Sequence, residues 1–149
     1  MDAGTTILPL MLKTFEFVNH TADAAVRAYG RDLRELCENA ANGMAALMAD
    51  VERLPAGEQR QVEVHAWDRT ELVLKFLREL HAIHEIDLVL FKRVRVLECD
   101  EQHLVAIAEV VPMMENLEAA GSDVKAVTFH NVEIEEEDGL LSVVVVFDI

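Results

Sequence analysis

Two short segments carry side chains that could hold a metal ion. The first is His20-Thr21-Ala22-Asp23, a polar stretch that no hydrophobic periodicity explains, and the second is the chain end, where Asp148 precedes the carboxylate of Ile149. If Asp23 lies beside the chain end, three oxygen donors converge, and such donors suit Ca²⁺ or Mg²⁺, with Mn²⁺ as an alternative. Taken alone, an Asp between two short strands is usually a turn residue, and strand ends usually reach solvent. These residues by themselves leave both interpretations open.

The segment that leads to Asp148 predicts a buried strand. Apart from Ser142, residues 140–147 are apolar at both odd and even positions, which is typical of a central strand covered on both faces. Negative groups at the end of such a strand are costly unless they are paired or ligated. A two-residue turn at Asp138-Gly139 predicts that Asp148 lies opposite Phe129. In that register Lys125 shares a face with Asp148, roughly 14 Å further along the strand.

The histidines are weaker candidates for a site. His20 and His130 could flank the acidic residues as hydrogen-bond donors, or they could be satisfied interior histidines. His81 and His84 have the i, i+3 spacing of half a metal site, but such pairs on amphipathic helices are mostly rim histidines. Zinc is not expected, because no Cys or His cluster has the spacing of a zinc site. The sequence also contains no phosphate-cradling Gly loop and no nucleophile motif.

Hydrophobic patterns predict the elements that would position these residues. Asp32 with Glu35, and Asp68 with Glu71, have the spacing of a capping box and predict two helix starts. The order strand-strand-helix-strand-helix, followed by a run of C-terminal strands, predicts an α+β fold with two amphipathic helices packed on a mainly antiparallel sheet. The strands are expected at residues 13–18, 24–29, 61–66, 88–97, 103–111, 125–135 and 140–147.

The length of the chain predicts a single domain. A chain of 149 residues corresponds to one ordinary globular domain. No linker or internal repeat interrupts residues 11–149, so we expect that range to fold as one unit. Residues 1–10 are expected to be a disordered extension or a start-site artefact, and they lack the basic segment of a secretory signal.

Charge and cysteine usage limit the classes of partner and compartment. The sequence has 13 Lys and Arg against 28 Asp and Glu, a net charge of −15, which a phosphate backbone would repel. Direct nucleic-acid binding is therefore not expected, whereas a basic protein partner or cations fit. No apolar run approaches the roughly 20 residues that span a bilayer, so no membrane association is expected. Cys37 and Cys99 lack metal-site spacing and predict reduced thiols in a cytoplasmic protein.

Three separated blocks of the sequence resemble the archease family. The resemblance covers residues 12–149, nearly the whole chain, and one of its blocks is anchored to the chain terminus. The blocks are Phe15-x-Phe17-x-x-His20-Thr21-Ala22-Asp23, then Ala28-Tyr29-Gly30-x-Asp32-Leu33 with Glu38-Asn39-Ala40-Ala41-x-Gly43-Met44, and finally Val124-Lys125-Ala126-Val127-Thr128-Phe129-His130 with Phe147-Asp148-Ile149.

The resemblance implies a function as well as a fold. Archeases are understood to promote guanylylation and multiple turnover of the RtcB-type tRNA-splicing RNA ligase, so the resemblance implies a cofactor protein of an RNA ligase rather than an enzyme. It implies a metal site, usually described with calcium, at Asp23, Asp148 and the C-terminal Ile149. The functionally important lysine of the family corresponds to Lys125.

Two alternatives from other classes accompany this hypothesis. A general chaperone or protein-modulating module is suggested by the acidity of the chain and by Met113-Met114 in a long predicted loop. A small metal-dependent hydrolase is the weaker alternative, because no general base, nucleophile or substrate pocket can be named from the sequence.

Overall fold

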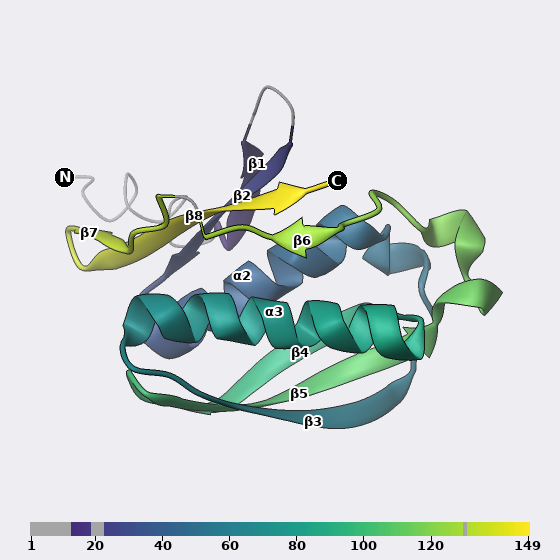
Figure 1. Cartoon of the computed structure of the whole chain (residues 1–149), viewed down its shortest axis with the longest axis horizontal. Helices are drawn as coiled ribbons and strands as arrows, with labels where there is room; N and C mark the ends of the chain where they lie inside the picture. Colours follow the sequence, from purple (N-terminus) through teal and green to yellow (C-terminus); the bar gives the residue numbers. More distant parts are fainter. Residues whose placement is uncertain (1–12, 19–22, 130) are drawn as a thin grey trace, which may run out of the picture.

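The structure is a computed structural model that describes residues 13–18, 23–129 and 131–149 (Figure 1). Its strands form two antiparallel sheets, one with the order β1-β2-β8-β6, in which β7 also pairs with β8, and one with the order β3-β5-β4. The predicted extension at residues 1–10 lies outside the described residues. The helices and strands are β1 (Phe15–Val18), β2 (Ala24–Gly30), α2 (Leu33–Met48), β3 (Glu58–His65), α3 (Arg69–Asp87), β4 (Val89–Cys99), β5 (His103–Pro112), β6 (Ala126–Val127), β7 (Glu135–Glu137) and β8 (Leu140–Asp148), with short 3-10 turns η1 (Val51–Arg53), η2 (Met113–Glu115) and η3 (Leu117–Ala119).

The two helices form a layer between the two sheets (Figure 1). Helix α2 packs against β2 of the larger sheet and β4 of the smaller one, whereas α3 packs against β3 and β6. The largest fully buried side chains include one from each layer, Phe147 of β8, Phe76 of α3 and Phe91 of β4. The predicted α+β class is confirmed, and the structure adds that the helices are covered by a sheet on both sides. No helix within the described ranges is long and apolar enough to cross a membrane.

Both helices begin where the capping pattern predicts. The Asp32 carboxylate accepts a hydrogen bond from the Glu35 N–H at 2.8 Å, and the Glu35 carboxylate accepts one from the Arg31 N–H at 2.9 Å. Asp68 and Glu71 repeat this reciprocal arrangement at the start of α3. In each pair the Asp satisfies an N–H of the first helical turn, and the Glu accepts from the residue before the N-cap, so the start of each helix is encoded locally.

Side chains of α2 cover the free edge of β4. Asn42 donates to the Val94 carbonyl at 2.8 Å and accepts from the Val94 N–H at 3.0 Å. One turn earlier, Glu38 accepts from the Val96 N–H at 2.9 Å, while Arg34 donates to the Val96 carbonyl at 3.1 Å. These side chains therefore replace the neighbouring strand that β4 lacks, and they protect a sheet edge that would otherwise expose unpaired backbone groups.

The predicted strand at 125–135 is interrupted. Its far end follows the predicted two-residue turn, since Glu137 pairs with Leu140 and both turn residues have positive φ. Its near end is shifted by three residues, because Ala126, not Phe129, pairs with Asp148. The extra residues lie in the segment 128–134, which opposes only residues 143–146 of β8. The predicted pairing of Asp148 with Phe129 is thus wrong.

Burial of apolar side chains explains the shift of register. Ile134 is buried, and Val132 packs partly buried against the same core. A regular strand would place Asn131 in an extended conformation, but it has a φ of 53°, in the left-handed region that Asn tolerates. The chain therefore leaves the ladder after Thr128, whose N–H still donates to the Val146 carbonyl at 2.9 Å, and Val132 and Ile134 pack against the core before pairing resumes at Glu135.

The covering of the β4 edge can be tested through Asn42. In the Asn42→Ala variant both backbone groups of Val94 lose their partner at a largely buried position, so we expect the free energy of unfolding to fall by about 1–3 kcal/mol. Lys75→Ala, at an exposed position of α3, is the matched control and should change it by less than about 0.5 kcal/mol. Urea denaturation measures both values. Equal stability of the two variants would show that the amide contributes nothing to the edge.

Candidate functional site

The register of the larger sheet brings Asp23 next to the chain end. Ala24, the first residue of β2, pairs with Phe147 of β8. Continued one residue beyond this last pair, the register would set Asp23 opposite Asp148. Directly opposite residues of antiparallel strands share a face and have Cβ atoms about 4.5–5.5 Å apart. Asp23 is half-buried and Asp148 is exposed, and continuation of the register would bring these two acidic residues from distant parts of the sequence to the same rim of the sheet.

The other side of β8 brings Lys125 to the same rim. The Lys125 N–H donates to the Asp148 carbonyl at 2.7 Å, and Asp148 pairs with Ala126. Lys125 is therefore a direct neighbour of Asp148 across the strand pair, instead of lying roughly 14 Å along it as the predicted register implied. Because Ala126 is the residue opposite Asp148, Lys125 is one residue out of phase with it, and the prediction that the two share a face is wrong.

Helix α3 holds this part of the chain through a buried histidine. The ring of His81, only 7% exposed, donates from Nε2 to the carbonyl of Val124 at 2.7 Å. Val124 directly precedes Lys125, so the backbone of the lysine is held by α3 on one side and by Asp148 on the other. His84 donates from Nδ1 to the carbonyl of Val89 at 2.7 Å and is also buried. The prediction that these are rim histidines is therefore wrong, because both are buried and each uses one ring nitrogen to bond a backbone carbonyl.

The chemistry of the rim suits a hard cation. Its side-chain donors are the oxygens of Asp23 and Asp148, and the terminal carboxylate of Ile149 follows directly in the chain. Clustered carboxylates repel one another, and a cation with oxygen ligands, such as Ca²⁺, relieves that repulsion. These donor types are the ones that the predicted hard cation prefers, and its binding stays a prediction. His20 and His130 lie outside the described residues, so their roles stay predictions.

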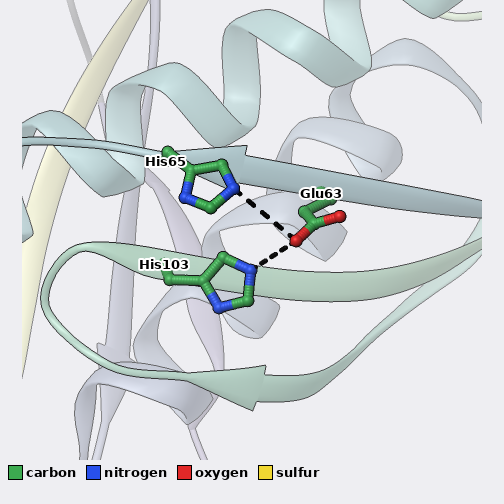
Figure 2. A group of neighbouring side chains, drawn as sticks. All are labelled: Glu63, His65 and His103. Carbon is green, nitrogen blue, oxygen red and sulfur yellow. Dashed lines mark hydrogen bonds and ion pairs between the residues drawn. The ribbon is translucent and has the colours of Figure 1, made fainter.

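The structure also brings together a group that the sequence analysis missed. Glu63 and His65 of β3 lie beside His103 of β5, with Glu63 Oε2 at 3.6 Å from His65 Nε2 and 2.5 Å from His103 Nε2 (Figure 2). The hydrogen bond from His103 holds the pKa of the Glu63 carboxyl below its ordinary value. The only sequence signal was the alternation Glu63-x-His65 on a strand. Its partner lies 38 residues beyond His65 and becomes adjacent only through the β3–β5 pairing.

The two cysteines are free thiols, as predicted. Cys37 of α2 is buried, and Cys99 at the end of β4 is half-buried. A hydrogen bond with Cys99, together with burial, raises the pKa of the Cys37 thiol. The same bond lowers the pKa of Cys99. Cys37 and Cys99, which are far apart in the sequence, are thus in contact.

Comparison with known proteins points to one family. The model of the Archease protein family (MTH1598/TM1083) matches residues 15–149. Protein archease of Methanothermobacter thermautotrophicus is 42% identical over 142 residues, which cover 93% of this chain and 100% of the relative. Protein archease of Sulfurisphaera tokodaii is 31% identical, with coverage of 93% and 100%.

Solved structures agree with the fold. The solution structure of Methanobacterium thermoautotrophicum protein 1598 has a TM-score of 0.77 and 38% identity, and covers 93% of this chain and 100% of that one. The crystal structure of an archease from Thermotoga maritima has a TM-score of 0.61 at 22% identity, covers 89% and 94%, and supports the fold alone. Since the family model includes Asp23, Lys125 and the chain end, and full-length relatives share up to two fifths of their residues, this chain belongs to the archease family.

Proposed function

We propose that this protein is a cytoplasmic accessory protein that promotes guanylylation and multiple turnover of an RtcB-type tRNA-splicing RNA ligase, without being an enzyme itself. Membership of the archease family supports this function. The observation that supports it most is the register of β2, β8 and β6, in which Lys125 bonds Asp148 and continuation of the β2–β8 pairing by one residue would bring Asp23 to the same rim. Carboxylates that hold a metal ion, with a lysine beside them, are the groups that stabilise the charge of a nucleoside triphosphate. Here that triphosphate would be bound by the partner protein.

In this proposal Asp23, Asp148 and the terminal carboxylate of Ile149 hold a hard cation, calcium with magnesium or manganese as alternatives. When bound, that cation supplies positive charge against phosphate oxygens. Lys125, exposed beside the same rim, contacts phosphate as a compact point charge. The chain itself supplies no nucleophile; its residues complete and orient the nucleotide site of the ligase.

The charge of the protein favours a protein partner over RNA. With a net charge of −15, it is repelled by an RNA backbone and attracted to the basic surface that an RNA-binding ligase presents. Such long-range attraction raises the rate of encounter and weakens with salt. The ligase can therefore bind its RNA and this protein without the two competing for one surface.

A general chaperone is the second candidate function. The Thermotoga maritima archease is described as a possible chaperone, and the present chain exposes Met114 and Leu117 around its η2 and η3 turns. The two functions differ in what they require: a chaperone would suppress aggregation of unrelated proteins without using Asp148, whereas ligase activation depends on it.

The acidic pair is tested by single-turnover GMP loading of the cognate ligase. Asp23→Asn and Asp148→Asn each remove one negative charge from the rim. We therefore expect each variant to reduce the stimulation of loading by about tenfold or more, which corresponds to a loss of about 1.4 kcal/mol of binding or transition-state stabilisation. Asp138→Asn makes the same change at the β7–β8 turn, where Asn tolerates the positive φ, and should stimulate like the wild type. Full stimulation by all three variants would contradict the proposal.

The chain end is tested by extending it. Two residues added after Ile149 displace the terminal carboxylate, and we expect calcium affinity and ligase stimulation to fall together. Ile149→Val keeps that carboxylate in place and serves as the control. Unchanged calcium binding by the extended protein, measured by calorimetry, would exclude the terminal carboxylate as a ligand.

The role of His81 in holding Lys125 is tested against its neighbour on α3. His81→Leu and His84→Leu each leave a backbone carbonyl without its donor, and each should lower the free energy of unfolding by about 1–3 kcal/mol. Only His81→Leu releases Val124, so only this variant should also lose ligase stimulation when both are assayed well below their melting temperatures. Equal stimulation by the two variants would show that the tether does not position the lysine.

A further inference from the structure

We propose that Glu63, His65 and His103 form a binding site for a transition-metal dication of the Zn²⁺ class on the outer face of the three-stranded sheet. This site is separate from the oxygen-lined rim at the chain end, because β3 and β5 lie on the far side of the helix layer from β8 (Figure 1).

The backbone of the sheet places the three side chains on one face. His65 and His103 are direct partners in the antiparallel β3–β5 pair. Glu63 lies two residues before His65 on the same strand, and residues at that spacing share a face. The alternate residues Val62 and Val64 are buried in the core, so Glu63 and His65 project outward. The position of all three Cβ atoms is thus fixed by a regular ladder rather than by a loop.

The donor atoms are close to the arrangement that a metal needs. His65 Nε2 and His103 Nε2 both face Glu63 Oε2, at 3.6 and 2.5 Å, and one ligand atom from each residue lies within 4.8 Å of the others (Figure 2). A tetrahedral ion with bonds of about 2.0–2.1 Å requires donors about 3.3 Å apart. The two rings are stacked with their centroids 4.5 Å apart. Small rotations of partly exposed side chains would complete the site.

The donor types decide which metals bind. Two imidazole nitrogens and one carboxylate suit Zn²⁺, Cu²⁺, Ni²⁺ and Co²⁺, whereas Ca²⁺ and Mg²⁺ prefer oxygen alone. The side chains of His65, Glu63 and His103 are 73%, 49% and 31% exposed, so a fourth position is open to water or to a ligand from a partner. The hydrogen bond with His103 lowers the pKa of the Glu63 carboxyl, and a bound metal would replace that hydrogen bond.

Trp67 provides a reporter beside the site. It is the only tryptophan in the sequence, lies two residues after His65, and is 83% exposed. We expect Cu²⁺ to quench its fluorescence in the full-length protein, and Zn²⁺ to compete with that quenching at a stoichiometry of one. Ca²⁺ should not compete.

Single substitutions identify the ligands. His65→Ala, His103→Ala and Glu63→Gln should each weaken Zn²⁺ binding, measured by calorimetry, by about tenfold or more. Glu58→Gln, an exposed position at the other end of β3, and Asp148→Asn at the chain end should leave it unchanged. Thermal unfolding without metal shows whether each variant is folded, and Zn²⁺ should raise the melting temperature of the wild type but not of the three site variants.

Several results would overturn the inference. Wild-type zinc affinity in all three site variants would show that the cluster is only a hydrogen-bonded surface group. Loss of zinc binding in Asp148→Asn would move the ion to the rim at the chain end. Because neither measurement involves the ligase, failure here leaves the proposed function standing, and failure of ligase stimulation leaves this site standing.

Discussion

The hydrogen bond from the Lys125 N–H to the Asp148 carbonyl fixes the end of β8 to the segment that leads into β6. Chain ends usually fray, because few contacts restrain them. Here the last strand has a partner on each side, β2 on one and β6 on the other, and its inward side chain Phe147 is fully buried. The chain up to Asp148 is consequently held by backbone pairing, and Phe147 is anchored in the core.

This constraint explains why helix α3 matters to a site to which it contributes no ligand. Strand β6 has only two residues, Ala126 and Val127, too few to hold its place by pairing alone. The buried His81 supplies the missing restraint by bonding the carbonyl of Val124. The position of Lys125 thus depends on the β6–β8 pairing and on His81 of α3, which are far apart in the sequence.

Local signals in the sequence predicted the fold well, and long-range packing decided the rest. The helix starts at Asp32 and Asp68 and the turn at Asp138 depend on neighbouring residues, so the pattern could predict them. The register of Asp148 depends on burial of Ile134, which no local pattern reveals. The function of the polar residues on α2 was equally hidden: Asn42 looks like a solvated helical position until β4 lies beside it.

The same distinction separates the two metal-site hypotheses. The sequence could predict the site at the chain end, because Asp23 and Asp148 belong to blocks that resemble a known family. The cluster around Glu63 could not be predicted, because its alternation is ordinary for a strand and His103 becomes a neighbour only once β3 pairs with β5. Oxygen donors and imidazole nitrogens select different ions. The helix layer lies between β8, which carries the oxygen donors, and the β3–β5 pair, which carries the histidines (Figure 1). The two hypotheses therefore concern different ions at separate places on the molecule, and each can be tested without the other.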